Sequence, residues 1–484
     1  MEYTIDELKK THALYDANIT EWNFRKLAYN GGLAFIEEVI NQHPREEDTS
    51  YQTRIDEAYG FNYCSSIVNL LNFFLCATPP QREPGALAVR PDYESFMANC
   101  DRYGTNFNFF LTEAQKISAI FSTVGILVDK PSGEHDIENP VVHPYLSLYT
   151  PPNILDWAFK KDENSNSYQL SFIKLRDDFH NYIVWDCEAW AVYETDTEEV
   201  EILNIKKGIN PLGSIPFVWS PNIRTVQHPY IGVSDIVDVT RINAALIRGI
   251  SECEQNFKYN AFPMLMMPDE LDRPEMDDDS SETVVGRDAV LPFNPEYSNG
   301  KPDWLESPVL DPVRAHLEWM DRVVDEAYRS VLLSSMIQQR DKAQSKSGSL
   351  LRAEYIQLNS VLSKKANSMI ETERQIVKLF CKWQGCDDLY KGYSISPTRQ
   401  FSIDDLATEL DYTFNAVDKL GSKTFKYEAF KRIANELLPN IPTSTFDTIE
   451  KELLVVANTP EPVETDNGTD TGNSTASSST SSTA

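Results

Sequence analysis

A long apolar seam, from residue 348 to residue 383, constrains the fold of this chain more than any other feature. Its apolar residues recur at steps of three, four and seven, a spacing that gathers them on one face of an α-helix. A helix of this length would measure about 54 Å. The seam therefore predicts one very long helix, and its members include Leu351, Tyr355, Leu358, Leu362, Met369, Ile376, Phe380 and Trp383.

Two more helical patterns precede this seam. The first covers residues 234–257, where Ser234 is a plausible N-cap and Asp235 suits the positive end of the helix dipole. The second covers residues 312–333 and begins with a proline, which is favoured in a first turn. Residues 261–307, between the two, read as a small insertion of turns and short strands. Residues 400–458 predict a further helical module.

The first half of the chain predicts helices followed by strands. Residues 3–40, 50–78 and 91–122 have helical periodicity, with Gly31-Gly32 as a break. The segments after residue 123 are short and rich in β-branched and aromatic residues, which favours strands. The fold class is therefore α+β, and the expected strands are VGILVDKP (124–131), YQLSFIKL (168–175), YIVWD (182–186), WAVYE (190–194) and IPFVWS (215–220).

Motifs that would indicate catalysis are absent from the sequence. It contains no GxxxxGK[ST], GxGxxG, HExxH or GxSxG pattern. His135 and His143 are separated by Pro140, which argues against a shared metal site on a helix. We therefore expect no enzyme activity, no catalytic residue, no metal and no cofactor.

The seven cysteines are scattered without a CxxC pair, and the N-terminus lacks an apolar signal region. We expect free thiols in a reducing compartment, with Cys381 and Cys386 as buried structural thiols. No run of 18 apolar residues is present, so we expect no membrane span. The end of the chain, residues 459–484, has a Ser/Thr-rich composition that predicts a disordered tail.

Charged residues are distributed unevenly along the chain. The formal net charge is −30, which argues against nucleic-acid binding over the whole surface. Residues 268–282 hold eight acids against one arginine, but they lack EF-hand spacing and contain two prolines. They read as a solvated acidic loop, or as a partner-docking surface made by Asp269, Glu270, Asp272, Glu275, Asp277, Asp278 and Asp279.

A small basic segment, residues 334–347, lies between the second and third long helical patterns. It is either an ordinary solvated loop or a site of phosphate contact, because Lys and Arg bind phosphates without sequence preference. One copy would bind DNA weakly, whereas a ring of copies would surround a duplex. The candidate DNA-contacting residues are Gln338, Gln339, Arg340, Lys342 and Lys346.

The order of these elements resembles the portal protein family of tailed bacteriophages over nearly the whole chain. Several stretches carry the resemblance: Trp22 with YNGGLAFI (29–36), YQTRIDEAYGFNYCSSIVN (51–69), GILVDKP (125–131) and SGSLLRAEYIQLNSVLSKKANSMIETERQIVKL (347–379). The last is similar to the small-residue start and Lys-Lys-Ala centre of the long wing helix in that family.

The resemblance implies a division into eight parts. Residues 1–233 would form the first part of a wing, residues 234–258 and 312–333 two stem helices, and residues 259–311 a clip. Residues 334–347 would be a tunnel loop, residues 348–399 the long wing helix and its connection, and residues 400–458 a crown before the tail at 459–484.

The same resemblance implies a function. Portal subunits form a twelve-fold ring at one capsid vertex of the virion, assembled in the host cytoplasm. Double-stranded DNA is packaged and ejected through this ring. It would dock terminase, head-completion or adaptor proteins, and the major capsid and scaffolding proteins, without a membrane. Twelve helices about 10 Å wide leave a channel of roughly 28 Å, which admits a duplex. An acidic wall would repel moving DNA while Arg340, Lys342 and Lys346 steady it.

Two other functions remain open from the sequence. One is another head-to-tail adaptor protein of the virion, which the chain length and the order of the helices disfavour. The other is a metal-dependent phosphoesterase or nuclease that would use Asp269, Asp277, Asp278 or Asp279.

Overall fold

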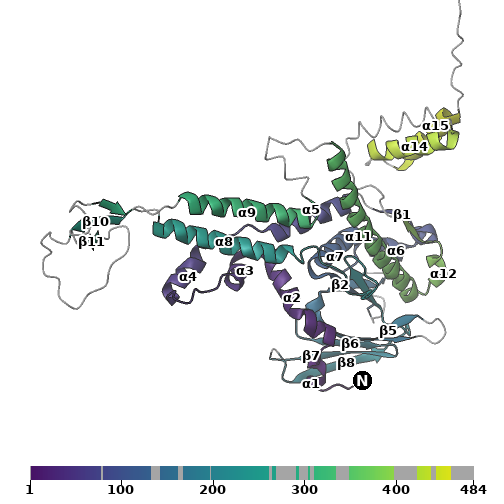
Figure 1. Ribbon diagram of the computed structural model, residues 1–484. Coiled ribbons are helices and arrows are strands. Elements are labelled where there is room, and N and C mark those ends of the chain that lie inside the picture. Colours follow the sequence, from purple (N-terminus) through teal and green to yellow (C-terminus); the bar gives the residue numbers. More distant parts are fainter. Residues whose placement is uncertain are drawn as a thin grey trace, which may run out of the picture. The chain divides into compact units, whose positions relative to one another are not determined.

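The structure is a computed structural model (Figure 1). It describes residues 2–77, 80–131, 142–161, 167–196, 198–260, 264–268, 290–293, 303–305, 310–333, 348–396, 422–437 and 443–458. The chain divides into two compact units, Met1–Phe401 and Ser402–Ala484. Helices and strands occur together in the first unit, so the α+β fold class is confirmed.

Seven helices cover the N-terminal part of the first unit in the described residues: α1 (Ile5–Lys9), α2 (Ala13–Asn30), α3 (Gly32–Val39), α4 (Asp48–Glu57), α5 (Tyr63–Cys76), α6 (Pro91–Ala98) and α7 (Phe107–Phe121). The expected break at Gly31 is confirmed, with a φ of 63° that favours glycine.

Two of the expected helices were wrong in extent, because each is two helices. Residues 50–78 divide at a turn around Gly60, which packs so closely on a later helix that a Cβ would lie 2.6 Å from Ile247. Residues 91–122 divide between α6 and α7. There Asn106 caps α7 by accepting a hydrogen bond from the backbone N–H of Phe109 at 2.8 Å.

Two antiparallel sheets follow. The first has the strand order β3-β2-β9, from β2 (Thr123–Asp129), β3 (Tyr145–Tyr149) and β9 (Phe217–Pro221). The second is a five-stranded meander of β4 (Ile154–Lys161), β5 (Tyr168–Arg176), β6 (Tyr182–Asp186), β7 (Ala189–Thr195) and β8 (Ile202–Ile209). All five expected strands are confirmed, whereas β3, β4 and β8 were not predicted. The 3₁₀ helix η2 (Pro151–Asn153) leads into β4.

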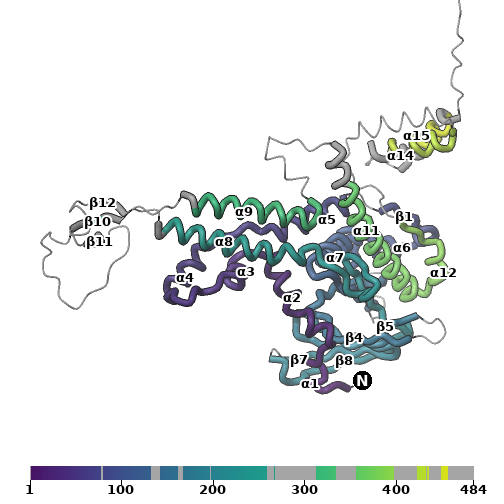
Figure 2. Tube along the Cα trace, in the orientation of Figure 1, coloured from purple at the N-terminus to yellow at the C-terminus, as the bar shows by residue number. Residues whose placement is uncertain are grey.

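Three long helices complete the first unit: α8 (Val239–Asn260), α9 (Leu310–Ser330) and α11 (Gly348–Trp383). Figure 2 shows α8 and α9 running beside each other. A three-stranded sheet of order β11-β10-β12 lies between them in sequence, formed by β10 (Met264–Pro268), β11 (Val290–Phe293) and β12 (Asp303–Leu305). The short strands expected in residues 261–307 are therefore confirmed.

The expected start of α8 was wrong. The helix begins at Val239, and residues 235–238 form a turn before it. Ser234 is not its N-cap, because it lies five residues before the helix. Its buried hydroxyl lies 2.8 and 2.7 Å from the carbonyl oxygens of Ala119 and Ile120, and it accepts a hydrogen bond from the backbone N–H of Ile236 in the turn at 3.2 Å. The backbone N–H of Asp235 also donates to the carbonyl of Ala119 at 2.9 Å, so contacts with the end of α7 hold residues 234 and 235 outside the helix.

Shorter elements close the first unit, and the second unit is helical where it is described. β1 (Gln81–Glu83) pairs with β13 (Ser394–Ser396), η1 (Gly85–Val89) precedes α6, and α12 (Asp387–Tyr390) follows α11. In the second unit, α14 (Lys423–Leu437) packs on α15 (Thr443–Asn458). Residues 401–410 and the tail from residue 459 lie outside the described residues.

Helix α11 passes over two hydrophobic cores. Its residues Leu358 and Leu362 belong to a core shared with α2, α3, α5 and α8, which includes Trp22 and Ile247. Its last turns, around Phe380, belong to a second core shared with α6, α7 and β2. This helix therefore connects both cores, as the apolar seam predicts.

Candidate functional site: the helix frame around residues 334–347

Both sets of predicted functional residues lie outside the described residues. The DNA-contacting candidates Gln338, Gln339, Arg340, Lys342 and Lys346 fall in residues 334–347, and the acidic candidates from Asp269 to Asp279 fall in residues 269–289. Their roles remain predictions. The structure does describe the helices on either side of both segments, and we call α8, α9 and α11 the helix frame.

The end of α9 determines how the chain enters the basic segment. The helix ends at Ser330, and Leu332 adopts a left-handed conformation with φ of 62°. The backbone N–H of Leu333 donates to the carbonyl of Tyr328 at 2.9 Å, which closes a Schellman-type end. The Leu333 side chain is fully buried in the first core. The segment therefore starts from a fixed point.

The α8–α9 pair is packed closely at one position. A Cβ at Gly249 on α8 would lie 2.4 Å from Cζ3 of Trp319 on α9, so this pair of residues allows the two helices to approach. Trp319 covers this glycine while leaving 40% of its surface exposed. The contact joins the helices on either side of the acidic insertion.

Charges on the α8–α9 pair are mixed. Over the two helices, six Lys and Arg residues stand against seven Asp and Glu residues. Arg241 contacts Glu21 at 2.7 Å, and Lys258 pairs with Glu57, both at the surface. The excess acid of the chain is therefore not concentrated on these two helices, and the predicted acidic wall draws no support from them.

Helix α11 is fixed to the turn that precedes α8 by a buried ion pair. The ammonium group of Lys365 contacts the carboxylate of Asp235, and their side chains are 2% and 5% exposed. The second carboxylate oxygen of Asp235 accepts a hydrogen bond from Nδ2 of Asn222 at 2.8 Å. Asn222 in turn accepts one from Nε2 of Gln115 at 2.8 Å. Such a pair is costly to break, because the remaining charge stays buried.

Two hydroxyl groups extend this attachment along the same face of α11. Ser368 donates to the carbonyl of Pro221, and Oγ1 of Thr372 donates to Oγ of Ser220 at 3.0 Å. Together with Lys365 they follow the i, i+3, i+7 spacing of one helix face. The middle of α11 is therefore bound to the end of β9 by polar contacts as well as by its apolar seam.

A second buried carboxylate fixes α11 on another side. Glu373 accepts two hydrogen bonds from the guanidinium of Arg82 on β1, at 2.5 and 2.8 Å, and a third from the hydroxyl of Tyr393. Burial, and then the adjacent Glu373 carboxylate, raise the pKa of Tyr393, which keeps the phenol protonated. The strand pair β1–β13 is thereby held against the long helix.

Sequence reasoning missed these attachments. It expected Asp235 to act on a helix dipole, and the structure corrects this role because Asp235 precedes α8 and binds Lys365. The adjacent charges in Lys364-Lys365-Ala366 are visible in the sequence, but their residue type alone does not distinguish the buried lysine from the exposed one. A charged residue inside the 348–383 seam, at the spacing of its apolar face, is the signal that identifies it.

The remaining candidate groups have structural positions. Cys381 and Cys386 are buried free thiols, as expected, and burial raises the pKa of Cys381 to about 12. His143 lies against the carbonyl of Pro144 at 2.8 Å, while His135 is outside the described residues. Within the described ranges, no group of three or more His, Cys, Asp or Glu is placed to hold a metal ion. None of the described helices is long and apolar enough to cross a membrane.

Comparison with known proteins gives only structural likenesses. No protein-family model matches the sequence, and no curated protein matches it. One similar solved structure is described as the neck of an empty GTA particle computed with C6 symmetry. It is 12% identical with a TM-score of 0.45, covering 87% of this chain and 99% of that one.

A second similar structure is described as the neck of a native GTA particle computed with C12 symmetry. It is 11% identical with a TM-score of 0.40, and the match covers 78% of this chain and 90% of that one. With TM-scores below 0.5 and such low identities, neither likeness establishes a shared fold or a shared function.

Proposed function

We propose that this chain is a portal-type subunit that closes into a ring at one vertex of a phage-like virion, through which double-stranded DNA passes. In this role it is structural and has no catalytic activity of its own. The observation that carries the proposal is the helix frame: a close α8–α9 pair flanks the small β10–β12 sheet, and a basic segment of 14 residues joins α9 to α11.

The frame suits a segment that must act on moving DNA. Leu333, the residue before this segment, is buried in the core, and α11 is bound through Lys365 to Asp235 in the turn before α8. A rigid support keeps weak phosphate contacts at a constant place, whereas each contact alone adds little affinity. Arg340, Lys342 and Lys346 are the residues assigned to these contacts, and the acids from Asp269 to Asp279 are assigned to partner docking.

The test reverses the charge of the basic segment. The triple variant Arg340→Glu, Lys342→Glu and Lys346→Glu should form rings of normal size, seen by negative-stain imaging, but package or retain DNA poorly. A matched control, Lys9→Glu, Lys10→Glu and Lys391→Glu, makes the same change in charge at exposed positions of the first unit. Normal packaging by the first variant, or failure of the wild-type chain to form rings, would contradict the proposal.

The enzymatic alternative has a direct test. A phosphoesterase or nuclease that uses Asp269, Asp277, Asp278 or Asp279 should cleave DNA with Mg²⁺ and stop when a chelator is added. We expect no cleavage by purified protein in either condition. Cleavage that is lost on Asp278→Asn would favour the enzyme.

A further inference from the structure

The two ends of the five-stranded sheet β4–β8 differ in shape and charge. At one end, where β5 begins, a cleft of about 770 Å³ is lined by residues of the sheet, β9 and α11. At the other end, where β5 finishes, two adjacent turns project from the sheet. Nine residues of β5 separate the two ends, about 30 Å at the rise of a strand.

The wall and floor of the cleft are aromatic. Trp219 packs edge-to-face on Phe217 at 5.3 Å, and Tyr230 packs on Trp219 at 5.7 Å and on Phe159 at 5.0 Å between ring centroids. All four residues line the cleft. A surface of packed rings is well suited to receive an apolar side chain.

Positive charge lines the rim of the cleft. Lys378 and Lys382 lie one turn apart on the face of α11 that borders it, and Arg224, which follows β9, also lines it. Lys382 contacts only the hydroxyl of Ser214, at 3.1 Å, and neither Lys378 nor Arg224 has an ion-pair partner in the described part of the chain. Glu371 is the one acid among the described lining residues. In a chain of net charge −30, such a site favours an acidic partner.

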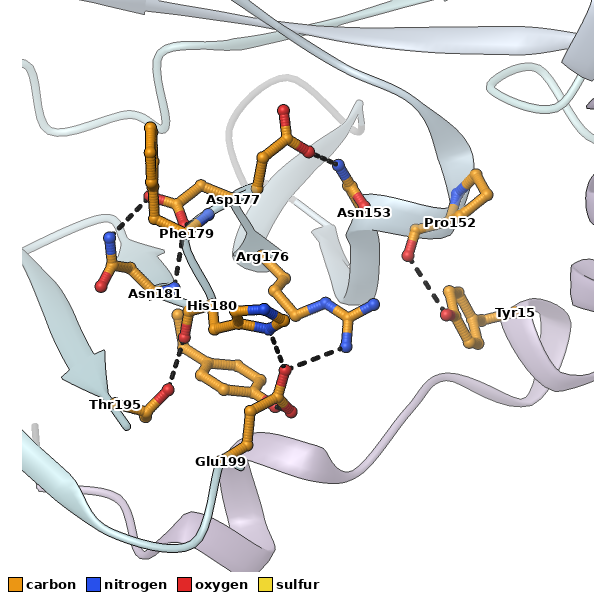
Figure 3. A network of polar contacts seen from close by, with 12 residues as sticks. Tyr15, Pro152, Asn153, Arg176, Asp177, Phe179, His180, Asn181, Thr195 and Glu199 are labelled. Carbon is orange, nitrogen blue, oxygen red and sulfur yellow. Dashed lines mark hydrogen bonds and ion pairs between the residues drawn. The ribbon is translucent and has the colours of Figure 1, made fainter. Parts of the chain in front are cut away.

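The opposite end of the sheet exposes apolar side chains and acids, which are complementary to the aromatic, basic cleft. We call residues 177–181 together with Asp196 and residues 198–201 the double turn (Figure 3). Phe179 is 82% exposed and Val200 is 58% exposed at its surface. Exposed acids stand beside these apolar side chains: Asp178, Glu198 and Glu201.

A polar network holds the double turn in shape. Glu199 accepts a hydrogen bond from the hydroxyl of Tyr182 at 2.6 Å, and lies 2.8 Å from Nδ1 of His180 and 3.3 Å from the guanidinium of Arg176 (Figure 3). Although burial raises the pKa of Glu199, these hydrogen bonds lower it overall, so the carboxylate stays charged.

Each turn is also closed by its own aspartate. Oδ1 of Asp177 accepts from the backbone N–H of Phe179 at 2.9 Å, and Oδ1 of Asp196 accepts from that of Val200 at 2.7 Å. Such side-chain bonds stabilise tight turns. The exposed Phe179 is therefore presented on a preformed support, not on a loose loop.

From these observations we infer that the double turn of one copy docks in the cleft of a second copy, with Phe179 against the aromatic floor and the acids against Arg224, Lys378 and Lys382. This inference rests on the proposed ring. The two surfaces are different and lie at opposite ends of the sheet, so the contact is head-to-tail. Such a contact generates a ring when the rotation between copies closes, as the proposed ring requires.

Disulfide cross-linking tests directly whether the double turn of one copy lies next to the cleft of another. In a background with the two half-buried cysteines replaced, Cys76→Ser and Cys187→Ser, the pair Phe179→Cys and Gln375→Cys should give a ladder of cross-linked species on mild oxidation. Gln375 lines the cleft. The control pair Phe179→Cys and Tyr103→Cys uses an exposed position outside the cleft and should give no ladder.

A charge exchange tests the same contact without cysteines. In the variant Arg224→Glu/Lys378→Glu, the fraction of protein found in rings should fall by about fivefold or more at physiological salt, because like charges then face each other. The variant Glu198→Lys/Glu201→Lys should lose them similarly, and the combination of all four changes should restore them. The exposed control Lys9→Glu/Lys391→Glu should leave ring formation unchanged.

The outcomes separate this inference from the proposed function. If the wild-type chain forms rings, but the two charge variants form them equally well and no ladder appears, the docking contact is wrong and the ring proposal stands. If the wild-type chain forms no ring, the ring proposal fails. A ladder in that case would leave the head-to-tail contact as an interface of an open assembly.

Discussion

The ion pairs of the α8 region and those of α11 make an instructive contrast. On α8, Arg241–Glu21 and Lys258–Glu57 lie at the surface, the first with side chains 73% and 39% exposed. On α11, Lys365–Asp235 and Glu373–Arg82 are buried and have further hydrogen bonds. Exposed pairs contribute little to stability, whereas a buried pair is costly to break. The stability of the helix frame should therefore depend on single charged residues along α11 but not along α8.

The largest expected effect comes from breaking the pair at the centre of α11. Lys365→Met leaves Asp235 buried with only Asn222 as a partner, so the free energy of unfolding of the first unit should fall by about 3–5 kcal/mol. Denaturant unfolding followed by tryptophan fluorescence measures this. The double variant Lys365→Met/Asp235→Leu should recover part of the loss, because no unpaired charge remains. A double variant no more stable than the single one would show that the pairing itself is not the cause.

A somewhat smaller loss is expected at the other buried carboxylate. Glu373→Gln should destabilise the first unit by about 2–4 kcal/mol, since Arg82 then lacks its counter-charge but reaches some solvent. The matched variant Tyr393→Phe removes only one hydrogen bond and should cost about 1 kcal/mol. If both variants lose the same free energy of unfolding, the charge of Glu373 contributes nothing beyond one hydrogen bond. Burial would then not explain why this pair matters more than the exposed pairs of α8.

A third ion pair, with side chains 4% and 12% exposed, allows a pH test. Arg54 binds Glu46 through two hydrogen bonds, at 2.8 and 2.6 Å, and this holds the pKa of Glu46 below its ordinary value of 4.5. A depressed folded-state pKa stabilises the protein above the unfolded pKa, and this stability is lost as pH falls through the folded value.

Wild-type protein and Glu46→Gln should therefore differ in stability most at neutral pH. The difference should shrink below pH 4.5, which melting curves at several pH values would measure. A difference that stays constant down to strongly acidic pH would assign the effect of Glu46 to packing instead of charge.

The smallest effect is expected at the surface of α8. Arg241→Ala should change the free energy of unfolding by less than about 1 kcal/mol, because both side chains of its pair are solvated. Raising the salt concentration should remove whatever difference remains. A loss as large as that of Lys365→Met would contradict the contrast from which these predictions start.

Much of the fold could be predicted because burial leaves a periodic pattern. The seam from Leu351 to Trp383 predicts α11 to its observed ends, Gly348 and Trp383, and YIVWD coincides with β6. Strand β8 was missed because it is an edge strand with most of its residues exposed, so its sequence shows no buried alternation. The turn at Gly60 was missed because its cause, contact with Ile247, is distant in sequence.

The candidate site was less predictable from sequence. The basic segment is visible as composition, but what supports it is not, because Lys365, Asp235, Asn222 and Gln115 come from four separated parts of the chain. Local signals for Ser234 and Asp235 favoured a helix cap, and tertiary demands on their side chains prevailed. Side-chain partners of this kind depend on tertiary proximity, which neither periodicity nor propensity encodes.

The left-handed Leu332 has a consequence for the direction in which the chain leaves α9. An L-residue in this conformation costs about 1–2 kcal/mol, so the local backbone preference opposes the observed path. The burial of the next side chain, Leu333, outweighs that cost and fixes the backbone conformation at the end of α9. The path by which the chain leaves α9 at residue 333 thus depends on one leucine in the hydrophobic interior. A smaller residue at position 333 would remove the burial that offsets the cost of the left-handed turn, and the last turn of α9 would lose its anchor.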